Sequence, residues 1–147
     1  MSGGRPTVVL LHGLGRTRLS MTRLERCLIR AGYATWSRSY PSRQMPVVEL
    51  AALVTDWIRT DLAGQRLAAV THSLGGILVR HMAEDLPFER TVMLAPPNRG
   101  SRLAGRLLRQ PALRLALGPA AGDIVAAGPW PPPPLPFAVI AGTRSAS

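Results

Sequence analysis

Short apolar runs alternate with amphipathic stretches along most of the chain. The run Thr7–Leu11 is apolar and β-branched, and it ends at His12-Gly13, where glycine permits a sharp turn. From Ser20 to Ala31 apolar residues recur at helical spacing, and Gly32 follows at the position of a C-terminal cap. The first part of the chain is therefore predicted to form a strand, a loop and a helix in that order.

The same alternation continues along the sequence, apart from one segment. Four further strands are predicted, over Tyr33–Tyr40, Leu67–Thr71, Thr91–Ala95 and Phe137–Ala141. Two further helices are predicted, one opening at Pro46 and the other covering Gly75–Leu86. Strands that alternate with helices form βαβ units, so the predicted fold class is α/β, with a mostly parallel sheet and helices on both faces.

Residues 96–136 break this alternation. The segment opens with two prolines, is interrupted at Pro111 and at Gly118-Pro119, and ends in four consecutive prolines at 131–134. Proline-rich chain favours a stiff, extended conformation. The segment is therefore predicted to be a connector or cap inserted in a single domain that spans residues 1–147.

Three arginines within this segment fall on one helical face, namely Arg102, Arg106 and Arg109. A lid or a membrane-surface contact is one interpretation of this face. An ordinary amphipathic surface helix is favoured over membrane binding, because Gly105 and Pro111 interrupt the pattern.

Composition adds a strong positive charge to this picture. The 147 residues carry 18 basic and 8 acidic side chains, a net charge of +10, and every basic residue is arginine. Such a charge attracts polyanions. The arginines are scattered, aromatic residues make up 5% of the chain, and no nucleic-acid-binding motif occurs, so a solvated surface is favoured and no nucleic-acid partner is expected.

The single cysteine and the N-terminus bear on the compartment. Cys27 lies among apolar positions of a predicted helix and is expected to be a buried core thiol. Residues 1–6 show no basic region followed by an apolar stretch, and the apolar run at 8–11 is too short for a membrane span. The expected location is the cytoplasm.

The strongest chemical signal is Thr71-His72-Ser73-Leu74-Gly75-Gly76, between a predicted strand and a predicted helix. A nucleophilic serine needs such a tight strand-to-helix turn, which lifts its hydroxyl above the sheet edge, while small neighbours let the helix and the strand pack closely. Ser73 is therefore the candidate nucleophile.

The second signal is His12-Gly13-Leu14-Gly15, at the end of the first predicted strand. Acyl transfer passes through an oxyanion that needs two aimed backbone N–H donors, each worth about 2.7–4 kcal/mol. One donor is expected from Leu74, directly after the serine, and the other from Leu14.

Three sequence segments carry a resemblance to a known family. They are VVLLHGLGRT at Val8–Thr17, THSLGGILVR at Thr71–Arg80 and APPNRGS at Ala95–Ser101. Through them the chain resembles the α/β-hydrolase superfamily, in particular bacterial esterase- and lipase-like members. The resemblance implies a small-molecule acyl ester as substrate, no metal or organic cofactor, Ser73 as nucleophile, and an oxyanion hole from Leu14 and Leu74, in a site shaped by His12, Gly13, His72 and Gly75.

The chain departs from the family pattern in two places. Thr71 stands where the first glycine of G-x-S-x-G is usual. Family members place the catalytic acid after the strand that matches Phe137–Ala141, and the histidine after one more strand, whereas here residues 142–147 follow. The last strand and helix of the fold are expected to be missing, and the exposed sheet edge is expected to promote self-association.

The histidines of the sequence offer no obvious substitute. His81 lies eight residues beyond Ser73 on a predicted helix, about 12 Å away at 1.5 Å per residue. His72 adjoins the serine but is expected to point elsewhere, and His12 is the remaining candidate base. Asp123 is the only conceivable acid.

Two hypotheses therefore remain open. The first is a serine hydrolase that forms an acyl-enzyme on Ser73, with the rest of its triad encoded downstream. The second is a non-catalytic α/β-hydrolase-like protein or truncated gene product, in which Ser73 is chemically ordinary.

Overall fold

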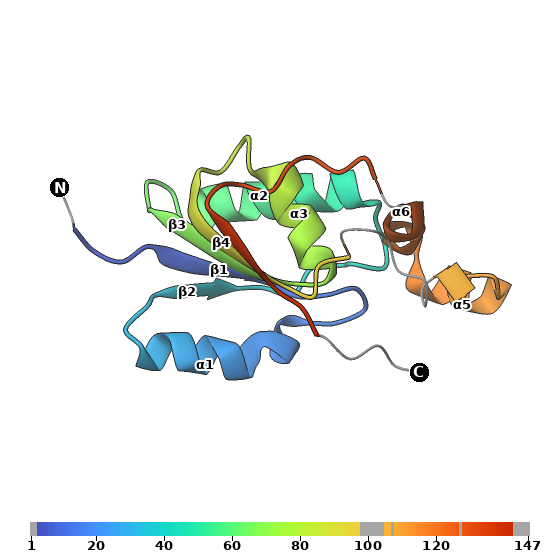
Figure 1. Cartoon of the computed structure of the whole chain (residues 1–147), viewed down its shortest axis with the longest axis horizontal. Coiled ribbons are helices and arrows are strands. Elements are labelled where there is room, and N and C mark those ends of the chain that lie inside the picture. Colours follow the sequence, from blue (N-terminus) through green and yellow to red (C-terminus); the bar gives the residue numbers. More distant parts are fainter. Residues whose placement is uncertain (1–2, 98–104, 107, 127, 143–147) are drawn as a thin grey trace.

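One parallel β-sheet organises the chain. The computed structural model describes residues 3–97, 105–106, 108–126 and 128–142. The strands of the sheet are β1 (Thr7–Leu11), β2 (Thr35–Ser37), β3 (Leu67–His72), β4 (Phe88–Leu94) and β5 (Phe137–Ile140). They lie in the order β2-β1-β3-β4-β5, and each neighbouring pair is parallel (Figure 1). The predicted α/β fold class is confirmed.

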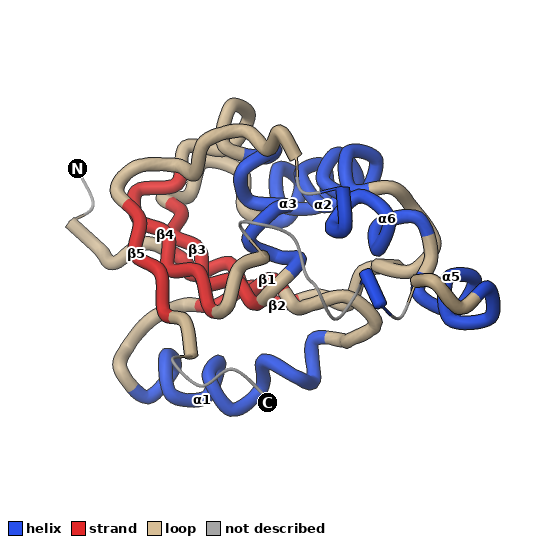
Figure 2. Tube along the Cα trace, turned by 45° about the vertical axis from the view of Figure 1, so that its right-hand side comes forward, coloured by secondary structure: helices blue, strands red, loops and turns tan. Residues whose placement is uncertain are grey.

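Helices cover both faces of this sheet. The helices are a short 3-10 helix (Arg18–Met21), α1 (Thr22–Arg30), α2 (Val47–Asp61), α3 (Leu74–Met82), α5 (Pro111–Leu117) and α6 (Pro119–Ala126). Helix α1 lies on one face, and α2 and α3 lie on the other (Figures 1 and 2). None of the described helices has the length and apolar character that crossing a bilayer requires.

Strand β1 is buried on both sides, which explains its continuous apolar sequence. Val9 and Leu11 belong to the large core formed with α2 and α3, whereas Val8 and Leu10 pack with Met21 on the α1 side. Successive side chains of a strand point to opposite faces, so a strand covered by helices on both faces needs apolar residues at every position.

The prediction of an extended connector over residues 96–136 is wrong for the part that forms α5 and α6. Pro111 and Pro119 each stand in the first turn of a helix. Proline is tolerated there because its missing N–H would have no intrahelical partner. Helix α6 buries Ala120 and Ile124 in the main core, and both helices lie beyond the carboxyl ends of the strands (Figures 1 and 2).

Cys27 is exposed, so the prediction of a core thiol is wrong. Leu24 and Leu28 turn toward the sheet, and Cys27 precedes Leu28 by one residue, about 100° around the helix. Arg102, one of the three arginines expected to share a helical face, lies outside the described residues, and Arg109 lies in a turn before α5.

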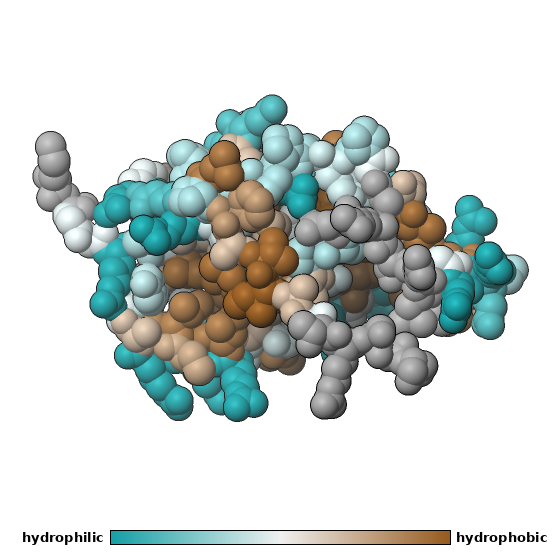
Figure 3. All heavy atoms as spheres, in the orientation of Figure 1, coloured by the Kyte–Doolittle hydropathy of each residue, from teal (hydrophilic) through white to brown (hydrophobic). Residues whose placement is uncertain are grey.

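Strand β5 forms one edge of the sheet among the described residues. All four of its residues are exposed, with Phe137 at 43%, Val139 at 42% and Ile140 at 61%. Figure 3 shows apolar side chains gathered on the face over this strand. An exposed apolar edge strand offers unpaired backbone groups and apolar side chains to another chain.

We expect this edge to promote self-association of the 147-residue chain. Replacing Val139 with lysine should lower the apparent molecular mass in light scattering after gel filtration, because a charged edge resists strand pairing. Leu19→Lys is the matched control, since Leu19 is 69% exposed but lies outside the sheet. A monomeric parent chain, or an equal effect of both variants, would contradict this expectation.

Candidate active site

The candidate residues meet at the carboxyl ends of β1 and β3. The chain leaves β1 toward β2 on one side and leaves β3 toward β4 on the other, so the connections diverge between these two strands. In open α/β sheets, ligands bind in the crevice formed at such a switch point. A Cβ atom added at Gly13 would lie 3.5 Å from Cβ of Ser73 and 3.0 Å from Nδ1 of His72. The structure thus brings the two sequence motifs together.

Ser73 occupies a strained turn between β3 and α3. Its φ of 49° and ψ of −115° fall in a region that residues with a side chain rarely adopt. Such strain costs about 1–3 kcal/mol and is kept where surrounding contacts enforce it. Here the Ser73 N–H donates to the Leu94 carbonyl at 3.0 Å, and the Gly76 N–H donates to the Ser73 carbonyl at 2.9 Å. The conformation matches the strand-to-helix elbow that the sequence predicts.

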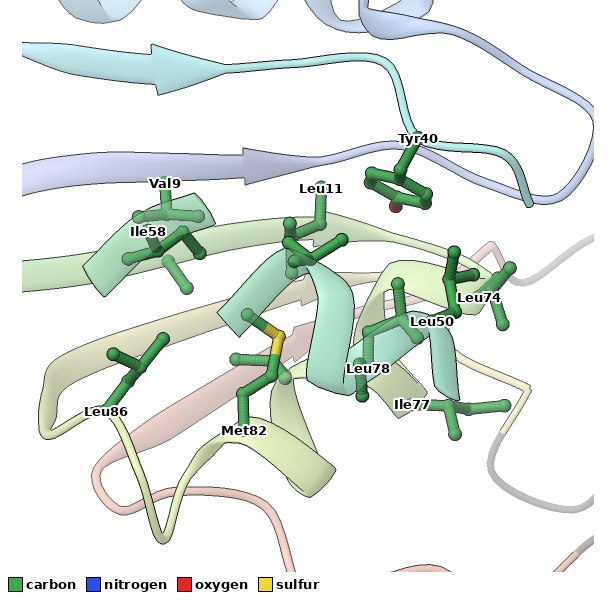
Figure 4. Close-up of a cluster of buried hydrophobic side chains, with 14 of the residues drawn as sticks. Val9, Leu11, Tyr40, Leu50, Ile58, Leu74, Ile77, Leu78, Met82 and Leu86 are labelled. Atoms are coloured by element: carbon green, nitrogen blue, oxygen red, sulfur yellow. The ribbon is translucent and has the colours of Figure 1, made fainter. Parts of the chain in front are cut away.

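Gly75 lets the first turn of α3 lie directly against β1. A Cβ atom at this position would lie 2.6 Å from the carbonyl oxygen of Leu11 and 2.8 Å from Cβ of Leu11. Leu11 and Leu74 are both completely buried, in the core shown in Figure 4. The absence of a side chain at Gly75 therefore sets the distance between the elbow and the end of β1.

The residues expected to donate to an oxyanion lie in two segments, the first turn of α3 and the loop after β1. Leu74 is the first residue of α3, so its N–H has no intrahelical acceptor and lies at the positive end of the helix dipole. Residues 13–16 form a turn in which the Arg16 N–H donates to the Gly13 carbonyl at 3.2 Å and Gly15 has a φ of +66°. This geometry fits a type II turn, whose second residue, Leu14, does not use its N–H in the turn's hydrogen bond.

Tyr40 and His12 fix the position of this loop. Nδ1 of His12 donates to the Gly13 carbonyl at 2.9 Å, and Nε2 accepts from the Tyr40 N–H at 3.1 Å. The Tyr40 hydroxyl donates to the His12 carbonyl, and the two rings stack with centroids 3.8 Å apart. Both ring nitrogens of His12 are therefore occupied by backbone groups, which makes His12 a structural residue in this arrangement.

Burial shifts the pKa values of His12 and Tyr40 in opposite directions. It lowers the pKa of His12, and the hydrogen bond to the Gly13 carbonyl offsets only part of this change. It raises the pKa of Tyr40 well above its usual 10.0, so the phenol remains a donor. The neutral imidazole and the neutral phenol are the forms that this hydrogen-bond pattern requires.

The other two histidines point into separate pockets. His72 lines a pocket of about 310 Å³ with Met21 and Leu24, on the α1 side of the sheet. His81 lines a pocket of about 280 Å³ with Asp123 and Trp130, two turns along α3 from Ser73. Burial lowers the pKa of His81, and the Asp123 carboxylate opposes this effect. Within the described part of the chain, neither His12 nor His81 is placed to accept the Ser73 proton.

Asp123, considered from the sequence as a catalytic acid, instead binds the start of helix α2. Its carboxylate accepts a hydrogen bond from the Val47 N–H at 2.8 Å, and so satisfies the first turn of α2. Among the described residues, no three His, Cys, Asp or Glu side chains gather in a way that could hold a metal ion.

Two residues around the loop had no signal in the sequence. Tyr40 holds His12, and the Ser42 hydroxyl accepts from the Gly15 N–H at 2.9 Å. Both lie 27 or more residues from their partners, in a segment without a recognisable motif. Only the fold reveals that this segment holds the candidate oxyanion loop.

The sequence matches the model of the Alpha/beta hydrolase family over residues 8–145. The chain therefore belongs to the alpha/beta hydrolase family. No sequence among the curated proteins matches it.

Solved structures with the same fold include several lipolytic enzymes. Phospholipase PlaB from Legionella pneumophila is 27% identical, with a TM-score of 0.60 over 83% of this chain and 32% of its own. A mature lipase from Bacillus licheniformis is 22% identical, with a TM-score of 0.67 over 86% and 57%. A monoacylglycerol lipase from Paleococcus ferrophilus is 22% identical, with a TM-score of 0.66 over 95% and 75%. The chain thus spans about a third of the Legionella protein and just over half of the Bacillus protein.

Gly75→Ala should destabilise the protein strongly, because the added Cβ would meet backbone atoms of β1 that cannot move independently. We expect a loss of about 1–3 kcal/mol in the free energy of unfolding, measured by urea denaturation. Gly122→Ala is the matched control, since Gly122 lies in α6 with nothing within 4 Å of an added Cβ. It should gain about 0.5–1 kcal/mol. Equal effects in both variants would refute the close approach.

The stability of the protein should fall on acidification through His12. The unfolded chain takes up a proton near pH 6.5, whereas folded His12 does so only at lower pH. The unfolded state then binds more protons, so stability is full above pH 6.5 and declines below it, by about 1.4 kcal/mol per unit of pKa difference.

Urea denaturation between about pH 8 and pH 5 measures this dependence. His12→Gln should flatten the curve, and His81→Gln separates the contribution of the second histidine whose pKa is lowered. A His12→Gln variant with the slope of the parent protein would show that His12 does not carry the effect.

Proposed function

We propose that the protein is a serine hydrolase of carboxylic esters, with Ser73 as the nucleophile. The observation that carries this proposal is the strained turn at Ser73, held beside the Gly13 loop at the switch point of the sheet. Strain of this kind concentrates at functional sites. Ala95, directly after β4, also has a positive φ of 45°, so the strain at Ser73 supports the proposal together with the Gly13 loop beside it and not by itself.

In the proposed reaction, the Ser73 oxygen attacks the ester carbonyl carbon and its proton passes to a base. The electron pair of the C=O bond moves onto the oxygen, where the N–H groups of Leu14 and Leu74 stabilise the negative charge. Collapse of this intermediate expels the alcohol, which takes up the proton, and leaves an acyl group on Ser73. Water then hydrolyses the acyl-enzyme.

A small-molecule ester with an acyl chain is the proposed substrate. The names of the Bacillus lipase and the Paleococcus monoacylglycerol lipase support an acyl ester, as does membership of the family. The proposed chemistry involves only the ester, water and side-chain or backbone groups, so it needs no metal or organic cofactor.

A non-catalytic role is the alternative, and the histidines favour it. His12 is committed to Gly13 and Tyr40, and His81 faces another pocket, so neither of these two histidines is placed to accept the Ser73 proton. A site with an oxyanion hole but no base retains about 10³–10⁴-fold catalysis over water.

A fluorophosphonate probe distinguishes these functions. We expect Ser73-dependent labelling, detected by mass spectrometry, that disappears in Ser73→Ala and persists in Ser39→Ala, whose hydroxyl accepts from the Arg18 N–H. Folded protein that is not labelled, or is labelled equally after Ser73→Ala, would exclude the proposed nucleophile and favour the non-catalytic alternative.

Leu14→Pro tests the oxyanion hole in the same assay. Proline is favoured at the second position of a type II turn, so it should keep the loop conformation while removing one N–H donor. The labelling rate should fall about 10²–10³-fold, the effect of losing one such donor. An unchanged rate in a correctly folded variant would remove Leu14 from the proposed mechanism.

A further inference from the structure

A large basic pocket lies between the segment after β2 and helices α5 and α6. Its volume is about 650 Å³, within the range of small-molecule sites. Three arginines line it, Arg43, Arg109 and Arg114, together with apolar residues such as Leu108 and Leu115. A pocket with cationic and apolar walls suits a ligand with an anionic group and a hydrocarbon part.

Contacts of Arg43 connect this pocket to the candidate active site. The neighbouring Ser42 hydroxyl accepts from the Gly15 N–H, and a Cβ atom at Gly15 would lie 3.7 Å from Cδ of Arg43. Gly15 is two residues from Gly13, a span of at most about 7 Å, and Gly13 lies beside Ser73. The basic pocket therefore begins next to the loop that would hold the oxyanion.

Helices α5 and α6 form the opposite wall of the pocket, and the residue between them contacts the segment after β2. A Cβ atom at Gly118, between α5 and α6, would collide with the carbonyl oxygen of Arg43. Arg114 of α5 and Arg43 of this segment line the same pocket. The pocket is thus built by contacts between backbone segments and does not depend on side chains alone.

The described residues that line the pocket include three arginines and no acidic residue, so the positive charge of the pocket is not neutralised by its own lining. The ion pairs among the described residues involve other arginines, in Arg38–Asp61, Arg59–Asp85 and Arg66–Glu89. The carboxylate nearest in sequence, Asp123 beside Gly122, is bound to the Val47 N–H. A bound anion would supply the missing negative charge.

We infer that this pocket binds the anionic group of a single-chain acyl ester, with a phosphate monoester as the preferred anion. Arginine forms paired hydrogen bonds with phosphate, and three guanidinium groups can neutralise a charge near −2. The apolar walls accommodate the adjoining hydrocarbon. The role in substrate selection rests on the proposed ester hydrolysis, whereas the binding itself does not.

Binding is measured on the full chain carrying Ser73→Ala, so that no turnover occurs. Isothermal titration with monomeric octyl phosphate should show binding that weakens about three- to tenfold in Arg43→Gln and in Arg114→Gln, and that weakens as salt is added. Arg26→Gln on α1, an exposed arginine across the sheet from α2 and α3, is the matched control and should bind like the parent chain. Circular dichroism checks the fold of each variant.

Three outcomes would overturn the inference. Inorganic phosphate binding as tightly as octyl phosphate would show that the apolar walls take no part, and octyl glucoside binding as tightly would show that the arginines take none. An equal loss in Arg26→Gln, or binding only to anionic vesicles, would indicate general attraction by the basic surface. Because Ser73→Ala is used, a failure here leaves the proposed hydrolysis standing, and an unreactive Ser73 leaves the binding site standing.

Discussion

The first turn of helix α3 lies closer to the end of strand β1 than any residue larger than glycine at position 75 would allow. The candidate site depends on this approach. It brings the elbow at Ser73 beside Gly13, so that the two N–H donors proposed for the oxyanion come from two adjacent segments, the first turn of α3 and the loop after β1. The strained backbone at Ser73 is tolerated because β4 and the first helical turn both bond to it.

The second requirement is a loop that holds its shape, and buried hydrogen bonds to His12 provide it. An imidazole can donate to one backbone group and accept from another only while it is neutral, and burial favours this neutral form by lowering the pKa of His12. The residue that the sequence offers as the remaining candidate base is therefore committed to structure. The segment after β2 contacts this loop through Ser42 and Arg43, and Arg43 also lines the basic pocket, so the same segment supports both proposed sites.

Much of this arrangement could be predicted from local sequence. The continuous apolar run of β1 and the Gly75-Gly76 pair after Ser73 identify the strand, the elbow and the family, because each reflects a constraint within a few residues. The predicted strand over Tyr33–Tyr40 is confirmed only at Thr35–Ser37, since Tyr40 leaves the sheet to stack on His12. Three features depend on packing between distant segments, so no local sequence pattern predicts them. They are the contact of Tyr40 with His12, the helices that begin at Pro111 and Pro119, and the capping of α2 by Asp123.

If Ser73 carries the acyl group, trapping that acyl-enzyme is the most direct test of the proposed hydrolysis. After rapid acid quenching of a reaction with a short activated ester, tryptic digestion releases residues 67–80, a peptide that contains a single serine. Mass spectrometry should find the acyl group on this peptide, at Ser73. An acyl group on another peptide, or a folded protein that forms no acyl adduct at all, would contradict it.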